Sequence, residues 1–381
     1  VVMLARTGAG GTPANAPLVD RAPGSLCGRA TSPTGGPARY FAAAGFAGIS
    51  IDGPMTGSRT VANNVSYFSG EDQDVFNVFN MFAMRDNIRE SALELVFGAN
   101  VLEQLDIPVA QCAGIADGVH VQLDGRQIAL FSHSLGSSIA PLVLAAEPRF
   151  ALAILSGAGG SWIENIRYKQ MPQPLRPIFD LFTVSSQAAQ HDPVLSLLQW
   201  ALEPADGAVY ASSARQGPGG LRHVLMVQGI VDHYILPPIA NALSVPLGID
   251  LVGEERDDCQ SPPDDIDPTL KAAMCSAYDG MVPLDAIMPM ADMARLPAPV
   301  TANRQGSTAV LFQVNRRVPA GNACTKPDQG PDGHEAIYEE PAAQYAYRCF
   351  LESWASTGRP TFPATRAVLD PATDGCAGAA P

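Results

Sequence analysis

Residues 128–146 read IALFSHSLGSSIAPLVLAA, and this is the most informative stretch of the chain. Gln127 to Phe131 is a short apolar run typical of a buried strand, and Ser137 to Ala146 carries an Ala/Leu/Ile/Val face typical of a helix. Between them, Ser132-His133-Ser134-Leu135-Gly136 forms a strand-to-helix junction. In a G-x-S-x-G turn at such a junction, the central serine is strained and its neighbours must be small. Ser134 fits the central position, with Ser132 in place of the first glycine.

Apolar runs typical of strands alternate with longer segments typical of helices along the rest of the chain. The predicted strands are Val1 to Ala5, Phe46 to Asp52, Ala151 to Leu155, Leu221 to Val227 and Thr308 to Val314. The predicted helices are Pro37 to Gly45, Val75 to Leu105, Ile239 to Leu247 and Pro341 to Ser356. This alternation predicts an α/β fold, in which helices cover both faces of a mostly parallel sheet.

The Ser-His-Ser-Leu-Gly junction, with a strand before it and a helix after it, resembles the nucleophile turn of the α/β-hydrolase superfamily. The resemblance runs from Val1 to about Phe362. It implies a serine nucleophile, an acid and a histidine, in that order along the chain. Gln228-Gly229-Ile230-Val231-Asp232 follows a late predicted strand and is similar to the turn that presents the acid. The resemblance therefore makes Asp232 the candidate acid.

Six histidines are candidates for the base, and only His233 and His334 follow Asp232. His233 adjoins the acid on the same turn, which places it poorly for a bridge to Ser134. His334 stands in Gly-Pro-Asp-Gly-His-Glu, between the last predicted strand and helix, where the family places its base. A serine hydroxyl needs an imidazole to accept its proton, and a carboxylate to hold that imidazole in the right tautomer. Asp232 and His334 also fit ordinary turns, but their order and context favour the triad.

Attack on an acyl carbonyl also needs two preorganised N–H donors for the oxyanion, each worth about 3 kcal/mol. The backbone N–H of Leu135, directly after the nucleophile, is the first candidate. The resemblance implies that the second donor lies in the turn after Val1 to Ala5, where Thr7 and Gly8 are the candidates. The same placement would make this strand the third of the fold, with up to two strands expected upstream of Val1.

The resemblance divides the chain into a first part of the hydrolase core at residues 1–160, a cap at 161–220, and a second part at 221–362 with an irregular insertion at 251–306. Residues 363–381 form a C-terminal tail. The cap is rich in apolar residues, and it favours a hydrophobic acyl or alcohol group, with His133 and Trp162 beside the substrate. The alternatives are that the apolar side chains bury the cap against the core, and that His133 packs.

The chain of 381 residues has 24 Lys+Arg against 38 Asp+Glu, a formal net charge of −14, and 46% hydrophobic residues, which is a globular composition. An acidic chain without a basic cluster would be repelled by nucleic acid. The longest apolar stretches are far below the ~18 residues of a membrane helix, so no transmembrane segment is expected. The sequence starts at Val1, without an initiator Met or a signal-peptide pattern. We therefore expect that any targeting segment was cleaved or not included.

Seven cysteines are spread along the chain without a CxxC pair or a Cys/His cluster, which argues against a structural zinc site. They are Cys27, Cys112, Cys259, Cys275, Cys324, Cys349 and Cys376. Six can pair with one left free, in a connectivity that sequence does not give, and buried unpaired thiols are an equally simple explanation. The short separations from Cys259 to Cys275 and from Cys324 to Cys349 favour disulfides, and hence a secreted or periplasmic protein.

An acidic run that could bind calcium consists of Asp257-Asp258, Asp264-Asp265 and Asp267. The prolines in it and the absence of EF-hand spacing favour a solvated loop instead. No nucleotide motif stands at a strand-to-helix turn, because Gly8-Ala9-Gly10-Gly11 is too simple for a phosphate cradle. We therefore expect no metal and no cofactor.

The expected function is a serine hydrolase that cleaves a small-molecule or lipid-like carboxylic ester through an acyl-enzyme. At lower specificity the chain resembles secreted bacterial lipases and carboxylesterases, through Arg85-Asp86-Asn87, the Ser-x-Ser-Leu-Gly turn, and Val227-Gln228-Gly229 with Asp232-His233-Tyr234. A peptidase, thioesterase or acyltransferase with the same triad is an alternative. A non-catalytic binding protein is another, because Ser132 replaces the usual glycine and the His-Gly common after the first strand is absent. The sequence leaves the oligomeric state open.

Overall fold

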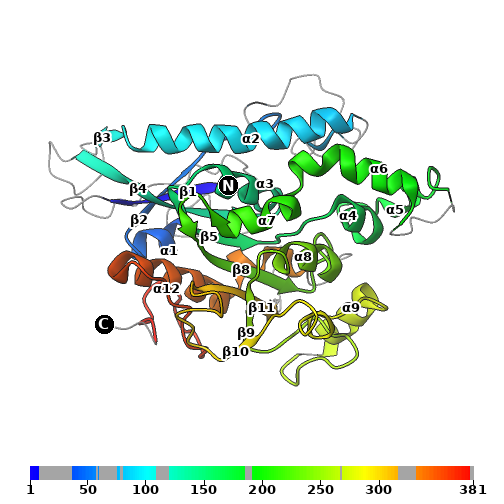
Figure 1. The fold of residues 1–381 in the computed structure, drawn as a ribbon. Coiled ribbons are helices and arrows are strands. Elements are labelled where there is room, and N and C mark those ends of the chain that lie inside the picture. The colour runs from blue at the N-terminus through cyan, green and yellow to red at the C-terminus, as the bar shows by residue number, and fades with distance from the viewer. Residues whose placement is uncertain are drawn as a thin grey trace.

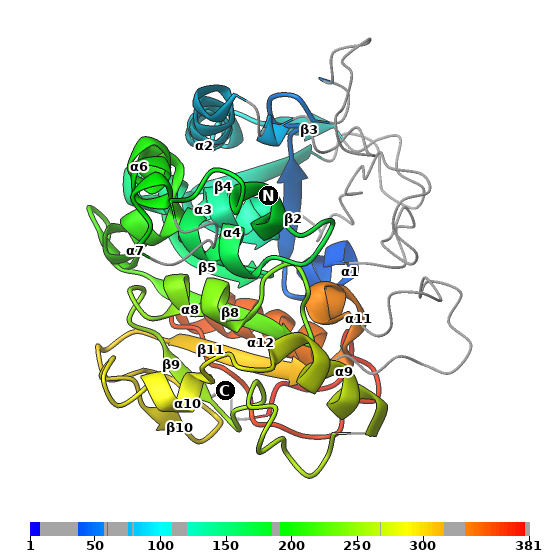
Figure 2. The same cartoon turned by 90° about the vertical axis from the view of Figure 1, so that its right-hand side faces the viewer.

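A twisted sheet with the strand order β2-β1-β4-β5-β8-β11-β9-β10 forms the centre of the structure, and β3 pairs with β4 beside it (Figures 1 and 2). The structure is a computed structural model that describes residues 1–7, 37–56, 59, 75–77, 80–108, 120–184, 191–266, 268–315 and 332–377. The strands are β1 Val2–Thr7, β2 Phe46–Ser50, β3 Asp106–Pro108, β4 His120–His133, β5 Phe150–Ser156, β8 His223–Ile230, β9 Asp250–Val252, β10 Arg295–Leu296 and β11 Ala309–Asn315.

The sheet is parallel from β4 to β10, and β1 runs antiparallel to both of its neighbours, β2 and β4. The predicted α/β class with a mostly parallel sheet is confirmed. The exceptions are β1 and β3, which both pair antiparallel with β4. Because β1 is antiparallel to β4, Val2 pairs with Phe131 near the end of β4, whereas Thr7 pairs with Leu123 far upstream. The start of β1 therefore lies near the Ser134 end of β4, and the end of β1 lies away from it.

Alternate side chains of the central strands enter two separate hydrophobic clusters, one on each face of the sheet. In β4, Ile128 and Leu130 belong to the cluster that contains the helices α2 and α3. Ala129 and Phe131 belong to the cluster that contains α1 and α12. This period of two is the strand repeat, and it explains why the central strands are apolar at nearly every position. Helices therefore cover both faces, as Figure 1 shows.

The covering helices agree with the sequence in position and differ at their ends. They are α1 Pro37–Ala43, α2 Met81–Leu102, α3 Leu135–Ala146, α8 Pro237–Ser244 and α12 Pro341–Thr357. Helix α2 begins later than predicted, at Met81, because the side chain of Asn80 caps it by accepting a hydrogen bond from the N–H of Ala83 at 3.1 Å. Such a cap satisfies one of the four N–H groups that a helix start leaves without a partner.

The segment between β5 and β8 is helical, as predicted for residues 161–220. Its elements are α4 Trp162–Tyr168, α5 Arg176–Phe179, α6 Pro193–Leu202, η3 Glu203–Ala205, α7 Gly207–Arg215 and the short hairpin of β6 Gln216–Gly217 with β7 Gly220–Leu221. Helix α7 packs directly on α3, so this end of the segment belongs to the covering layer of the sheet. Helices α4, α5 and α6 lie beyond it, on the side of the molecule that carries the end of β4 (Figure 1).

Residues 251–306 are more regular than the sequence suggests. They contain the helices α9 Pro268–Tyr278 and α10 Leu284–Ile287, and β9 and β10 extend the sheet by two short strands. Strands of two or three residues carry no periodicity, so they cannot be recognised from sequence. Among the described residues, no helix is both long enough and apolar enough to cross a membrane.

A disulfide ties the C-terminal tail to the last helix. Cys349 in α12 bonds to Cys376, and the two are separated by 27 residues. Cys259 and Cys275 are free thiols, although the Sγ of Cys275 lies 2.8 Å from the carbonyl oxygen of Cys259. The three other cysteines lie outside the described residues.

We predict that Cys376→Ser lowers the free energy of unfolding by about 3 kcal/mol, because a crosslink that closes a loop of this length restricts the unfolded chain. Urea unfolding of the oxidised protein measures the change. Cys275→Ser, which breaks no disulfide, is the control. Equal free energies of unfolding for wild type and Cys376→Ser would show that this disulfide does not stabilise the protein.

Candidate active site

Ser134 stands directly after β4 and caps the start of α3 with φ 54° and ψ −123°. A non-glycine residue rarely adopts a positive φ, and such strain is concentrated at functional sites. The turn is held because the N–H of Ser134 donates to the carbonyl of Ser156 at 2.9 Å. Gly136 lies in a tight space, since a Cβ at this position would lie 3.0 Å from Val1 Cγ2. The turn therefore has the tight geometry that the motif predicts.

Ser132, which replaces the usual glycine of the motif, has a role in this turn. Its side chain is buried, and its Oγ lies 3.1 Å from the Oγ of Ser137. Ser137 in turn donates to the carbonyl of Ser156 at 2.9 Å and accepts from the N–H of Ser156 at 3.2 Å. These bonds fasten α3 to the neighbouring strand β5. No spacing in residues 128–146 indicates this crosslink.

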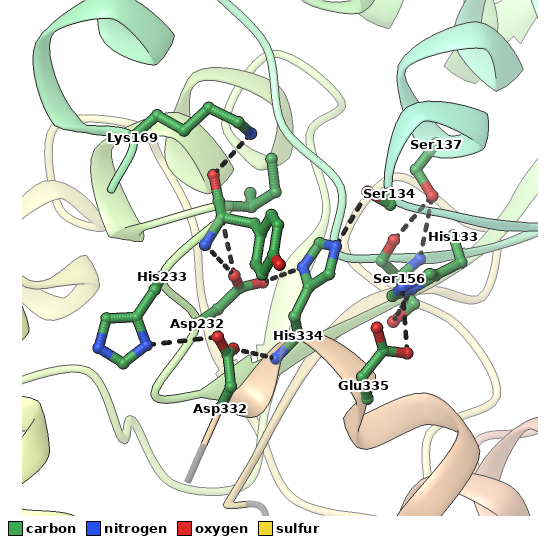
Figure 3. A network of polar contacts seen from close by, with 12 residues as sticks. His133, Ser134, Ser137, Ser156, Lys169, Asp232, His233, Asp332, His334 and Glu335 are labelled. Atoms are coloured by element: carbon green, nitrogen blue, oxygen red, sulfur yellow. Dashed lines mark hydrogen bonds and ion pairs between the residues drawn. The ribbon is translucent and has the colours of Figure 1, made fainter. Parts of the chain in front are cut away.

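Three side chains that are far apart in sequence form one hydrogen-bonded chain at the end of the sheet (Figure 3). His334 Nε2 lies 2.9 Å from Ser134 Oγ, and His334 Nδ1 lies 2.9 Å from Asp232 Oδ2. Asp232 is 1% exposed and His334 is 5% exposed. An imidazole held by a buried carboxylate can accept the proton of a serine hydroxyl. The structure thus brings together the three residues that the sequence selects.

Asp232 is fixed by backbone donors on its own turn. Its Oδ1 accepts hydrogen bonds from the N–H of Tyr234 at 2.7 Å and from the N–H of Ile235 at 2.8 Å. The Asp232 N–H donates to the hydroxyl of Tyr278, a fully buried side chain of α9. The side chain therefore has one oxygen fixed by the turn and one directed at His334.

His334 lies in a short 3₁₀ helix, Gly333–Glu335, that packs against the end of β8. The Asp332 side chain caps this helix by accepting from the N–H of His334 at 2.9 Å, and the N–H of Gly333 donates to the carbonyl of Val231. A Cβ on Gly229 would lie 1.8 Å from the carbonyl oxygen of Gly333, so no side chain fits there. The Tyr234 ring stacks on His334 at 4.4 Å between centroids. Backbone contact and stacking together set the position of the imidazole.

His233 links the acid turn to the loop that carries His334. Its Nδ1 lies 3.4 Å from Asp332 Oδ2, and this contact raises the pKa of His233 above its ordinary value despite partial burial. Its carbonyl oxygen accepts the N–H groups of Gln170 at 3.1 Å and Met171 at 3.0 Å, which follow α4. His233 thus takes no part in a bridge to Ser134, as expected, but it joins three segments around the site.

A cavity that is partly open to solvent lies beside Ser134. It is lined by Phe76, Ser134, Leu135, Ser138, Gly159, Gly160, Ser161, Trp162, Asn165, Lys169, Ala205, Asp206, Gly207 and Ile235. A second, larger and apolar cavity adjoins it between α2, α4, α5 and α6, and shares four of these residues. The larger cavity does not contain Ser134, so we regard it as an extension of the site and not as its centre.

Of the residues proposed to bind substrate, Trp162 lines both cavities, and His133 lines neither. The His133 ring packs 4.6 Å from the His334 ring and 5.0 Å from Tyr338. Its Nε2 lies 3.6 Å from Glu335 Oε2. These contacts agree with the packing alternative for His133, because its ring lies against His334 and Tyr338 and lines neither cavity.

Of the candidates for the oxyanion donors, Leu135 lies beside Ser134. It lines the same cavity and is the first residue of α3, where helix geometry leaves the backbone N–H without an intrahelical acceptor. The prediction for Thr7 is wrong, because the antiparallel direction of β1 places it beside Leu123. Gly8 lies outside the described residues.

Some apolar residues of the predicted cap line a cavity, and others pack against the core. Trp162, Leu175 and Phe179 line the apolar cavity, whereas Ile166 and Leu198 are also buried in the core cluster. Several others are exposed, namely Leu181, Phe182, Leu197 and Trp200. The cap therefore both encloses a cavity and packs on the core.

The acidic run after β9 is partly buried rather than fully solvated. Asp257 is 3% exposed and accepts from the N–H of Leu284, while Asp265 pairs with Arg256 at 2.9 Å. Burial and the nearby Asp257 raise the pKa of Glu255 to about 9, so this pair retains a proton near neutrality. Within the described part of the chain, no group of three or more His, Cys, Asp or Glu side chains is arranged to hold a metal ion.

We predict that Gly229→Ala lowers the free energy of unfolding by about 3 kcal/mol, because the new methyl group would overlap the Gly333 carbonyl and force the His334 loop away. Urea unfolding measures this loss. Gly375→Ala is the matched control, since a Cβ at that position meets no atom within 4 Å. A Gly229→Ala protein as stable as the control would contradict the close contact.

Comparisons of the chain with protein-family models, with curated proteins and with solved structures give no significant match. The function therefore has to be argued from the chemistry of the site itself.

Proposed function

We propose that the protein is a serine hydrolase of the α/β-hydrolase type, which cleaves carboxylic esters through an acyl-enzyme on Ser134. The observation that carries the proposal is the continuous hydrogen-bonded chain from Ser134 through His334 to Asp232, at the edge of a cavity. The order serine, acid, histidine along the chain and the strand-to-helix turn at Ser134 support the family.

In the first half of the reaction, His334 Nε2 accepts the proton of Ser134 Oγ while this oxygen attacks the ester carbonyl. Asp232 stabilises the imidazolium that forms, through its contact with Nδ1. The backbone N–H of Leu135 donates to the developing oxyanion at the start of α3, where the helix dipole also favours negative charge. His334 then protonates the leaving alkoxide, and the alcohol departs.

In the second half, a water molecule takes the place of the alcohol. His334 accepts a proton from this water while the water oxygen attacks the acyl carbon. His334 then returns this proton to Ser134 Oγ as the bond between Oγ and the acyl carbon breaks and the acid departs. The apolar cavity beside Trp162 supports an ester with a hydrophobic part, because apolar surface buried there contributes about 25 cal/mol per Å². A peptidase, thioesterase or acyltransferase would use the same residues, so a substrate panel has to separate these activities.

The disulfide between Cys349 and Cys376 supports a secreted or periplasmic location, since disulfides persist in oxidising compartments.

We predict that Ser134→Ala lowers kcat for p-nitrophenyl esters by about 10⁶-fold and abolishes labelling by a fluorophosphonate probe, because the nucleophile is gone. Ser212→Ala, at an exposed position on α7, is the control and should behave as wild type. Amide and thioester substrates are assayed in parallel. Labelling that persists in Ser134→Ala, or an unlabelled wild type, would contradict the proposal.

We predict that Asp232→Asn lowers kcat by about 10³- to 10⁴-fold with little change in KM. The amide cannot hold the His334 tautomer that leaves Nε2 free to accept the serine proton. Steady-state kinetics on one ester measures the effect, and circular dichroism verifies that the variant is folded. A decrease below tenfold would show that Asp232 does not act through His334.

A further inference from the structure

Lys169, at the end of α4, lies where the two cavities meet and lines both of them. It is the only charged side chain among the described residues that line the apolar cavity. The catalytic cavity has one other charged residue, Asp206, whose carboxylate accepts from Ser161 N–H, Ala208 N–H and the Gln199 side chain. Both carboxylate oxygens of Asp206 therefore accept hydrogen bonds from neutral donors. Lys169 is the positively charged side chain that lines this cavity.

The Lys169 ammonium group lies close to the catalytic residues. Its Nζ donates to the carbonyl of Tyr234 at 3.0 Å and lies 5.8 Å from the centroid of the Tyr234 ring (Figure 3). The same ring stacks on His334, with 4.4 Å between the two centroids. Tyr234 therefore lies beside both the ammonium group and the imidazole.

The surroundings of Lys169 leave its charge poorly compensated. Burial lowers the pKa of Lys169 to about 8, and the negative charge of Asp232 opposes this effect only in part. An ammonium group has three N–H donors, and among the described residues the Tyr234 carbonyl accepts from one of them. A desolvated cation with spare donors gains free energy when an anion binds beside it.

We propose that Lys169 determines the substrate class by binding a carboxylate on the acyl group, so that the preferred substrates are monoesters of dicarboxylic acids. This inference rests on the proposed function. An acyl group bonded to Ser134 Oγ begins in the catalytic cavity, and Lys169 stands at the boundary where that cavity opens into the apolar one. A methylene chain between the two carboxyl groups would lie along Trp162, which lines both spaces.

The simplest structural explanation for Lys169 is that it only holds the acid turn through the Tyr234 carbonyl. Two substitutions separate this explanation from carboxylate binding. Lys169→Gln keeps an N–H donor but removes the charge, and Lys169→Arg keeps the charge at every pH used in assays. Lys271→Gln removes an exposed lysine of α9 and is the control for the change in net charge.

The experiment measures kcat/KM for mono-p-nitrophenyl adipate and suberate against p-nitrophenyl hexanoate and octanoate, which match them in acyl length. We expect wild type and Lys271→Gln to favour the carboxylate esters. The preference ratio should fall at least tenfold in Lys169→Gln and persist in Lys169→Arg. Because kcat/KM reports the free enzyme, the wild-type ratio should also fall between about pH 7 and 9, whereas that of Lys169→Arg should not.

A ratio that does not change in Lys169→Gln overturns the proposal. An equal loss of activity on both ester types, with the ratio unchanged, also overturns it and assigns Lys169 to the support of the acid turn. Failure of the proposed function has a different signature: wild type would hydrolyse neither ester type and would not react with the fluorophosphonate probe. In that case the inference falls with the function on which it rests.

Discussion

The close approach of two glycines is the constraint on which the site depends. The backbone of Gly333 contacts that of Gly229 at the end of β8, and a Cβ on either residue would lie less than 3 Å from the other's backbone. This contact brings the His334 loop to the same strand that presents Asp232, so both hydrogen bonds of the imidazole follow from one piece of backbone packing. Side-chain chemistry at the site is thus positioned by two residues that have no side chain.

Much of the fold could be predicted because its signals are local and repeated. The central strands are apolar at successive positions since each face of the sheet has its own hydrophobic cluster. The alternation with helices then implied a parallel sheet. The triad could be predicted because Ser134, Asp232 and His334 each follow a recognisable strand, and the ends of parallel strands meet at one edge.

The rest depends on pairing partners, which a single sequence does not reveal. The direction of β1 becomes clear only from its antiparallel pairing with β2 and β4. Without that direction, Thr7 was expected near Ser134, whereas the end of β1 lies away from it. His133 was misplaced because the face of β4 on which a side chain lies depends on exact register. The roles of Ser137, His233 and Lys169 arise from contacts between distant segments, for which no spacing in the sequence gives a signal.

The bonds between the end of α4 and the acid turn have a consequence for the evolution of the segment between β5 and β8. The N–H groups of Gln170 and Met171 and the Nζ of Lys169 all donate to carbonyls of His233 and Tyr234. The segment is therefore not an interchangeable module. A foreign insertion grafted at the same two junctions would leave these carbonyls without their donors and loosen Asp232, so the wall of the cavity and the hydrogen-bonded chain through Asp232 have to change together.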